Sequence, residues 1–333
     1  MIVKTFVNKC LSLSRLSEKW CNLLIQNLVE AGRTISYVET TTPTQADTLH
    51  LAIKGSDKRT FMHEFEQVVR FAIAKLKLKN KKVKVAFDTT EDLTWCKKKL
   101  FLRPSVYDKP QSSWQYLNVS IIEPFFIPLM SIPYTLFDNL DHLVIDLVYF
   151  VESLPLKIDL MLFDRGFYHA HLIDFLNSRN HHYLMLVPER DIQKTYIEKT
   201  RKQKKRFDYF KHYFNYNKDK SSWNPSTLIL VRIVDDKTAW CYATNKKPSI
   251  ALTLEYRKRW NIETGFRVHD EARIKSKSDF LLIRFFYHLI GMLLIILWRL
   301  QNAINYVVFK RFLKRLELVY TRIEMMNKKP PPF

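Results

Sequence analysis

The stretch Lys157-Ile-Asp-Leu-Met-Leu-Phe-Asp164 indicates the fold class of this chain, because it is a short apolar run that ends in an aspartate. Arg-Gly-Phe-Tyr168 follows it, and the apolar spacing of Ala170 to Ser178 predicts a helix. A buried strand, a glycine turn and a helix in this order are typical of α/β proteins. Open α/β sheets build their sites at the carboxyl ends of strands, so Asp164 is a candidate site residue.

A second aspartate has the same placement earlier in the chain. In Lys82-Val-Lys-Val-Ala-Phe-Asp88, the residues Val83, Val85 and Phe87 recur at every second position, which predicts a half-buried strand that Asp88 closes. Further strands are expected in residues 116–134, which prolines divide by turns, and in residues 183–188. A helix is expected between them, over residues 138–153.

A third carboxylate lies in Tyr256-Arg-Lys-Arg-Trp-Asn-Ile-Glu263. At about 100° per helical residue, Tyr256, Glu263, Arg267 and Asp270 share one stripe of a helix, and Arg259 lies beside it. Mixed charges make a poor core face. Taken alone, the stretch fits a solvated surface helix, and its meaning depends on the two aspartates.

Three carboxylates on separate elements form a candidate metal site. Oxygen ligands of this kind favour Mg²⁺ or Mn²⁺. A pair of such ions can activate the attacking oxygen and neutralise the leaving oxygen in an in-line displacement at phosphorus. Each aspartate alone is also explained as a cap of the following helix or turn.

Composition favours an intracellular protein with a polyanionic partner. The 333 residues are 47% hydrophobic, enough for a sizeable core, and carry a net charge of +21. Such a charge fits nucleic acid best and an anionic membrane surface second. Four cysteines without a Cys-x-x-Cys pair, and a start without a sustained apolar run, favour the reducing cytoplasm.

The segment Phe280 to Trp298 is almost wholly apolar but is interrupted by Arg284 and His288. Its uninterrupted part, Leu289 to Trp298, is shorter than the roughly 20 residues that a membrane-spanning helix needs. We therefore expect a buried core helix and no membrane partner.

In this order the three carboxylates resemble those of the DDE transposases of the IS4-like superfamily. Asp88 matches the first aspartate, Asp164 in Asp-Arg-Gly-Phe-Tyr matches the second, and Glu263 matches the third carboxylate. The Tyr-x-x-Arg-x-x-x-Glu signature of the family is present as Tyr256, Arg259 and Glu263. The resemblance covers roughly residues 80 to 310. It implies an RNase H-like mixed sheet flanked by helices, with a β-rich insertion and a helical N-terminal region.

The resemblance also implies a role for each matched residue. Asp88, Asp164 and Glu263 would be catalytic and would bind two Mg²⁺ or Mn²⁺ ions, and Tyr256 and Arg259 would bind DNA phosphates. The family pattern has a lysine after the glutamate where this chain has Asp270. The phosphate contact of that lysine is expected from nearby basic residues, for which the candidates are Arg267, Arg273, Lys275 and Lys277.

The implied function is that of an insertion-sequence transposase, which cuts the DNA ends of its element and joins them to target DNA. Its partners would be element ends and target DNA, bound by a homodimer in the cytoplasm at the nucleoid. Two alternatives stay open. One is an RNase H-like nuclease without strand transfer, and the other is a non-catalytic basic protein that binds DNA or a membrane surface.

Five regions are expected along the chain. Residues 1–80 would be a helical N-terminal region that could bind DNA ends, and residues 81–188 would be the first part of the catalytic core. Residues 189–249 would be the β-rich insertion, which includes the basic run Lys199 to Arg206. Residues 250–312 would complete the core, and residues 313–333 would be a basic tail.

Overall fold

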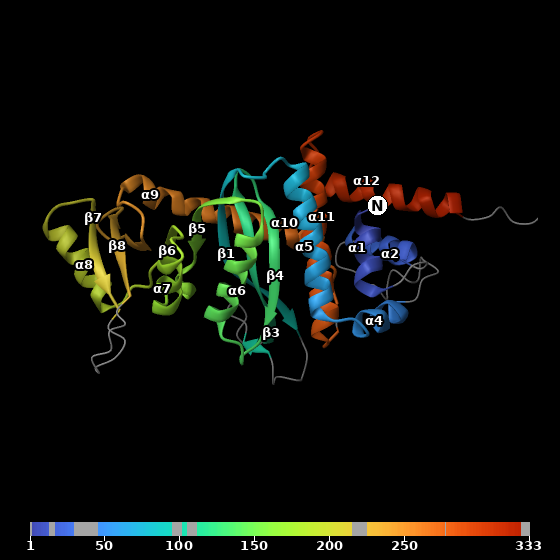
Figure 1. Cartoon of the computed structure of the whole chain (residues 1–333), viewed down its shortest axis with the longest axis horizontal. Helices are drawn as coiled ribbons and strands as arrows, with labels where there is room; N and C mark the ends of the chain where they lie inside the picture. Colours follow the sequence, from blue (N-terminus) through green and yellow to red (C-terminus); the bar gives the residue numbers. More distant parts are fainter. Residues whose placement is uncertain are drawn as a thin grey trace, which may run out of the picture.

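A computed structural model describes residues 2–12, 17–29, 46–94, 102–104, 112–214, 225–276 and 278–327. In this part of the chain, one mixed sheet runs through the molecule, with helices on its faces and a helical region at one end (Figure 1). The nine strands are β1 (Lys82–Thr94), β2 (Arg103–Pro104), β3 (Ser112–Glu123), β4 (Ile127–Tyr134), β5 (Lys157–Phe163), β6 (Tyr183–Leu186), β7 (Phe207–Tyr213), β8 (Ser226–Ile233) and β9 (Ala239–Thr244).

The helices extend from the N-terminal region to the last described residues. They are α1 (Ile2–Leu11), α2 (Ser17–Val29), α4 (Ala46–Lys54), α5 (Lys58–Lys75), α6 (Leu140–Ser153), α7 (Ala170–Ser178), α8 (Asp191–Lys202), α9 (Ile250–Glu255), α10 (Trp260–Ala272), α11 (Leu281–Asn302) and α12 (Phe309–Asn327). Two short 3₁₀ segments, η1 (Arg165–Phe167) and η2 (Tyr256–Arg259), follow β5 and α9.

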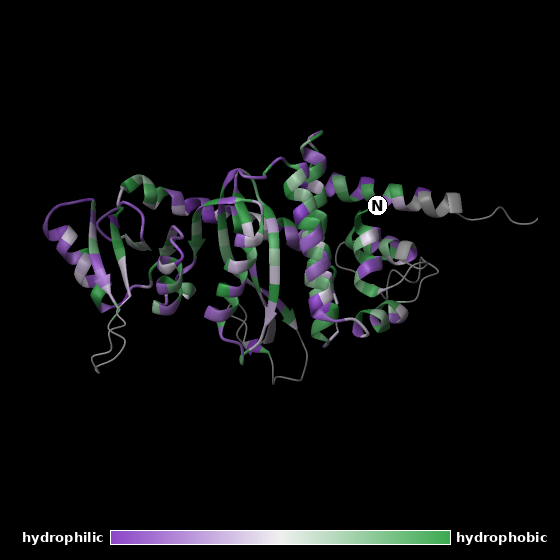
Figure 2. Ribbon diagram, viewed as in Figure 1, coloured by the Kyte–Doolittle hydropathy of each residue, from purple (hydrophilic) through white to green (hydrophobic). Residues whose placement is uncertain are grey.

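The sheet has the order β2-β3-β1-β5-β6-β9-β8-β7, and β4 pairs with the same edge of β3 as β2 does. β1 is antiparallel to β3 and parallel to β5, and β5 is parallel to β6. The expected RNase H-like mixed sheet flanked by helices is confirmed. Figure 2 shows hydrophobic residues along these central strands and hydrophilic residues on the outer faces of α5 and α8.

β1 is longer than its sequence pattern predicts, and the prediction that Asp88 closes the strand is wrong. The strand continues to Thr94, and its register with β3 runs from Asp88 opposite Asn118 to Thr94 opposite Ser112. Glu91 and Asp92 have a weak local preference for a strand, so pairing with β3 determines the extension. The parallel pairing with β5 does end at Phe87, one residue before Asp88.

The β-rich insertion extends the same sheet. β9 is antiparallel to β6, β8 pairs with β9, and β7 forms the outer edge of the described sheet. α8 packs on β7 and β8, where Tyr196 stacks on Phe210 with ring centroids 4.5 Å apart. The insertion is therefore built onto the edge of the core sheet beyond β6.

Helices cover both faces of the core sheet. α6 packs on β3 and β4 and also contacts α7, whereas the apolar helix α11 contacts β4, α5, α4 and α10. α1 is the first helix of the N-terminal region, for which the sequence predicted a helical structure over residues 1–80. α12 packs against α2, so the chain after residue 309 returns to the N-terminal helices, and residues 328–333 lie outside the described part.

The buried core helix expected between residues 280 and 298 is α11. Among the described residues it is the one helix long and apolar enough to cross a membrane, as judged by length and composition alone. In the apolar window of this helix, 78% of the residues are buried inside the protein, which is the burial of a core helix.

Close packing of α10 against the β3–β4 turn leads to a stability prediction. A Cβ atom at Gly265 would lie 2.3 Å from Cζ of the buried Phe126. Gly265→Ala should lower the free energy of unfolding by about 1–3 kcal/mol through overpacking, which exceeds the gain of about 1 kcal/mol in helix propensity. Urea denaturation measures the change, with Thr264→Ala at an exposed position of the same helix as control. Unchanged or increased stability of Gly265→Ala would contradict this packing.

Candidate active site

Asp88 and Asp164 lie at one end of the parallel pair formed by β1 and β5. Asp88 follows the last residue of β1 that pairs with β5, and Asp164 follows β5 directly as the N-cap of η1. Asp88 is opposite Asn118 of β3, whose side-chain Oδ1 accepts a hydrogen bond from Nε2 of His288 of α11 at 3.1 Å. Asp88 therefore faces the side of the sheet that α10 and α11 cover.

The signature residues do not lie on one continuous helix, which corrects the predicted stripe. α9 ends at Glu255, η2 spans the next four residues, and α10 begins at Trp260. A 3₁₀ segment has three residues per turn, so Tyr256 and Arg259 are aligned and both point inward. Each is 7% exposed, whereas the Glu263 side chain, one turn into α10, is 50% exposed.

Arg259 brings the three carboxylates together. Its Nη1 donates to Asp88 Oδ2 at 3.3 Å, and its Nη2 donates to Glu263 Oε1 at 2.6 Å. Asp164 is close enough to contribute to the field that raises the pKa of Arg259, although burial opposes this rise. One buried guanidinium thus connects the middle of β1 with the first turn of α10, close to Asp164 at the end of β5.

Asp88 has an unusual protonation equilibrium. Burial, opposed in part by Arg259, raises the pKa of Asp88 to about 6, and the negative charges of Asp164 and Glu263 act in the same direction as burial. Asp164 and Glu263 therefore both lie close enough to Asp88 to disfavour its negative charge. This electrostatic grouping is what the order of the three residues in the sequence predicts.

Tyr256 connects the site to the insertion. Its hydroxyl donates to Asp164 Oδ1 at 3.4 Å, and its ring lies 5.3 Å from that of Tyr242 in β9. Burial raises the pKa of Tyr256 far above its usual value, so the phenol stays neutral and can act as a hydrogen-bond donor.

A network of four charged side chains holds the signature segment, residues 256–263, against the sheet. Lys84 of β1 pairs with Glu123 at 2.8 Å and also with Glu255, and Lys258 pairs with Glu123 at 3.0 Å and with Glu255 at 2.9 Å. Hydrogen bonds from Lys84 and Lys258 lower the pKa of Glu123. Burial alone would raise the pKa of Glu255, but the same two lysines lower it overall. The sequence analysis missed this network, because no local spacing reveals it.

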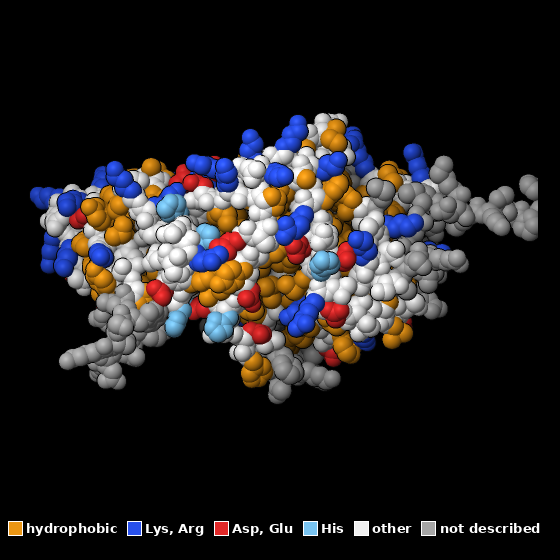
Figure 3. Space-filling model, in the orientation of Figure 1, with side chains coloured by type: hydrophobic (Ala, Val, Ile, Leu, Met, Phe, Trp, Pro, Cys, Tyr) orange, Lys and Arg blue, Asp and Glu red, His pale blue; other side chains and the backbone are white. Residues whose placement is uncertain are grey.

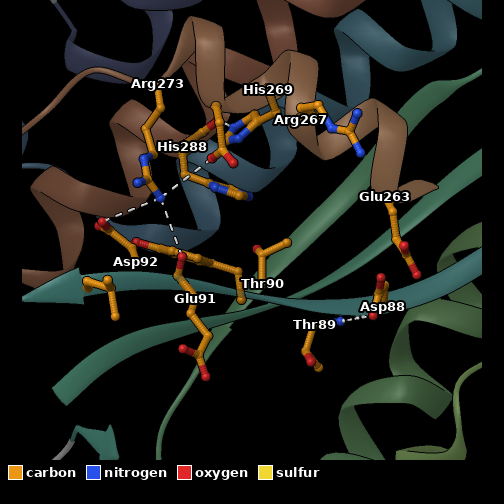
Figure 4. A pocket seen from close by; sticks show the side chains of 13 residues that line it. Asp88, Thr89, Thr90, Glu91, Asp92, Glu263, Arg267, His269, Arg273 and His288 are labelled. Atoms are coloured by element: carbon orange, nitrogen blue, oxygen red, sulfur yellow. Dashed lines mark hydrogen bonds and ion pairs between the residues drawn. The ribbon is translucent and has the colours of Figure 1, made fainter. Parts of the chain in front are cut away.

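A groove of about 480 Å³ extends from Asp88 and Glu263 along β1 and α10, and Asp164 is not among its lining residues (Figure 4). Its lining contains more acidic residues (Asp88, Glu91, Asp92, Glu263 and Asp270) than arginines. Arg267 and Arg273 of the groove are its predicted DNA contacts. Figure 3 shows Lys and Arg side chains elsewhere on the surface, over α8 and along the upper side of that view.

The basic candidates differ in how firmly they are held. Arg273 pairs with Asp92 at 3.8 Å and with Asp270 at 3.7 Å, and donates to the carbonyl of Glu91 at 3.4 Å. Arg267 is exposed in the groove and forms no ion pair with any described residue. Lys275 is exposed just after α10, and Lys277 lies outside the described residues.

The inner wall of the groove contains two buried histidines that the sequence analysis did not assign. His288 of α11 hydrogen-bonds to Ser131 at 3.0 Å and stacks on Tyr116, and Nε2 of His269 lies 3.0 Å from the carbonyl of His288. Burial lowers the pKa of both histidines, so they are neutral. The sequence did contain a signal for one of them, because His288 interrupts the apolar run that forms α11.

The ligand set fits a divalent cation by its chemistry, because three carboxylates converge in a partly buried site. Within the described ranges, no cluster of three or more His, Cys, Asp or Glu residues is already arranged to hold a metal ion. The three carboxylates surround Arg259 instead. Their assignment as metal ligands stays a prediction.

Comparison with known proteins agrees with this geometry. Residues 142–298, which include Asp164 and Glu263, match the family model for the transposase DDE domain. This segment resembles a transposase domain. The whole chain is similar in fold to the cryo-EM structure of a piggyBac transposase synaptic complex with hairpin DNA, with a TM-score of 0.60 and 10% sequence identity. The similarity covers 99% of this chain and 79% of that chain.

The family match supports a transposase DDE domain in residues 142–298 and leaves the IS4-like superfamily undetermined. At 10% identity, the structural match shows a shared fold. No curated protein sequence matches the chain.

The four-charge network leads to a pH-dependent stability prediction. A carboxylate whose pKa is lower in the folded protein than in the unfolded chain stabilises the fold at pH values above its unfolded pKa. This stabilisation is lost as the pH falls through its folded pKa. Lys84→Met should therefore lower the free energy of unfolding by about 1 kcal/mol at pH 7 and by much less at pH 3. Urea denaturation at both pH values measures this, with Lys82→Met at an exposed position of β1 as control. An equal loss at both pH values would exclude the charge pairs as the cause.

Proposed function

We propose that this protein is an insertion-sequence DNA transposase, which cuts the ends of its element and joins them to target DNA by metal-dependent phosphoryl transfer. One observation carries the proposal: Asp88 and Glu263, from separate elements, both pair with the buried Arg259, and Asp164 lies near enough to influence the charge of Arg259. The match of residues 142–298 to a transposase DDE domain supports the same conclusion.

Asp88, Asp164 and Glu263 would hold Mg²⁺ or Mn²⁺ ions, two in number. Bound there, such ions supply activation of a hydroxyl nucleophile and neutralisation of the leaving oxygen. The side chains of the protein bind and orient the DNA. The neutral Tyr256 phenol donates a hydrogen bond, and an arginine guanidinium can bind a phosphate through two parallel hydrogen bonds.

DNA binding would combine a weak contribution from the groove and a strong contribution from the remaining surface of the protein. The groove is rich in carboxylates, so Arg267 is its most available phosphate contact. The net charge of +21 provides sequence-independent affinity over the remaining surface. The end of α8 contributes to it, because residues 201–206 are exposed and mostly basic.

Element ends and target DNA are the proposed partners, and the protein would act as a homodimer on DNA in the cytoplasm. Joining two ends of one element requires that both be held together. The DNA-bound synaptic complex of the piggyBac transposase, which shares this fold, supports this view. Division of the chain into an end-binding region at 1–80, a core at 81–188 and 250–312, and an insertion at 189–249 belongs to the same proposal.

Removal of any one carboxylate should abolish DNA cleavage. Asp88→Asn, Asp164→Asn and Glu263→Gln should each reduce the rate by more than about 100-fold, since loss even of an outer-shell partner of a metal ligand costs 10–100-fold. Duplex binding, measured by fluorescence anisotropy, should persist. Asp270→Asn on the same helix is the matched control and should retain cleavage. Normal cleavage in the three variants would refute the proposal.

A strand-transfer assay separates the transposase from the two alternatives. A pre-cleaved end should be joined to plasmid DNA in the presence of Mg²⁺. Cleavage without joining would favour an RNase H-like nuclease, and DNA binding without any Mg²⁺-dependent reaction would favour a non-catalytic binding protein.

Two arginines of the groove should respond differently to substitution. Arg267→Gln should make the negative slope of the logarithm of the DNA-binding constant against log salt concentration shallower by about 0.9, the value for one lost phosphate contact. Thermal stability should not change. Arg273→Gln should decrease stability, because it leaves Asp92 and Asp270 without this partner. Lys314→Gln, at an exposed position of α12, controls for net charge. Equal salt slopes for wild type and Arg267→Gln would exclude Arg267 as a contact.

A further inference from the structure

The position of Arg259 suggests a role beyond binding phosphate. Its side chain is 9% exposed and is within hydrogen-bonding distance of Asp88 and Glu263. It also shares the electrostatic environment of Asp164. Among the described cations, Arg259 is the one with ion pairs to these carboxylates. Arg273, a partly buried arginine of the groove, is paired with Asp92 and Asp270.

We propose that Arg259 takes the place of the metal cation in the cation-free protein and that a divalent ion displaces it, which frees the guanidinium to bind a DNA phosphate. Cation binding and DNA binding would then strengthen each other through one side chain. This inference rests on the proposed function, because it takes Asp88, Asp164 and Glu263 as the ligands of the ion.

Displacement follows from the atoms that are shared. Nη2 of Arg259 lies 2.6 Å from Glu263 Oε1, and Nη1 lies 3.3 Å from Asp88 Oδ2. A divalent ion binds carboxylate oxygens at about 2.0–2.6 Å, so ion and guanidinium compete for the same oxygens. Two cations at such short separation in a partly buried site also repel strongly.

The surrounding structure allows the side chain to move while its backbone stays in place. Arg259 is the last residue of η2 and directly precedes α10. The preceding residue, Lys258, is fixed by Glu123 and Glu255. The Glu263 side chain is half exposed and provides an open side toward the groove.

The experiment measures Mn²⁺ affinity of the full chain without DNA, by electron paramagnetic resonance of the free ion. Arg259→Gln removes the competing cation and should bind Mn²⁺ about 10-fold more tightly than wild type, within the usual range of coupling. Arg257→Gln is the matched control, since it removes the same charge from an exposed position of η2. It should bind Mn²⁺ as wild type does.

Tighter Mn²⁺ binding by Arg259→Gln than by wild type and Arg257→Gln would support the exchange. The same holds if Arg259→Gln binds Mn²⁺ and wild type shows no binding. Equal or weaker binding in Arg259→Gln would overturn it. If that variant does not fold, wild type decides: a 30-base-pair duplex should raise its Mn²⁺ affinity at least 5-fold, and no increase would refute the exchange.

The proposed function has a separate criterion. Loss of cleavage in Asp88→Asn with unchanged Mn²⁺ affinity in Arg259→Gln would leave the transposase assignment intact and reject the exchange. Absence of Mn²⁺ binding in wild type and in all variants would reject both the exchange and the metal site.

Discussion

The pairing of β1 with two different neighbours is the constraint on which the rest of the structure depends. Its first half pairs in parallel with β5, and its whole length beyond Lys84 pairs with β3. Asp88 lies where the first pairing stops and the second continues. This position brings Asp88 beside Asp164 at the end of β5 and also makes the remainder of β1 one side of the groove.

Gathering three carboxylates costs free energy, and two groups of cations offset the cost. Arg259 contacts Asp88 and Glu263 directly, whereas Lys84 and Lys258 hold the signature segment through Glu123 and Glu255. The second group touches none of the three carboxylates. The geometry of the site can therefore persist when Arg259 changes its contacts, because the backbone of η2 is fixed by other charges.

Local sequence patterns predicted what depends on local structure. The strand before Asp164, the glycine turn and the helix over residues 170–178 all have short-range signals, and the structure contains them. The extension of β1, the union of β9 with β6 and the network around Lys84 depend on residues far apart in the chain, so spacing did not reveal them. The 3₁₀ break at Tyr256 also escaped prediction, because helical and 3₁₀ spacing coincide over one turn.

The contrast between the groove and the whole molecule bears on how DNA would be bound. A chain with a net charge of +21 has carboxylates as the main charged lining of its central groove. Long-range attraction would bring a polyanion to the surface, but a phosphate would meet repulsion at Asp88 and Glu263. Cations at these carboxylates would remove that repulsion. Under the proposed function, affinity for DNA and access to the reacting site would depend on different residues, and an ion bound at the carboxylates would couple the two.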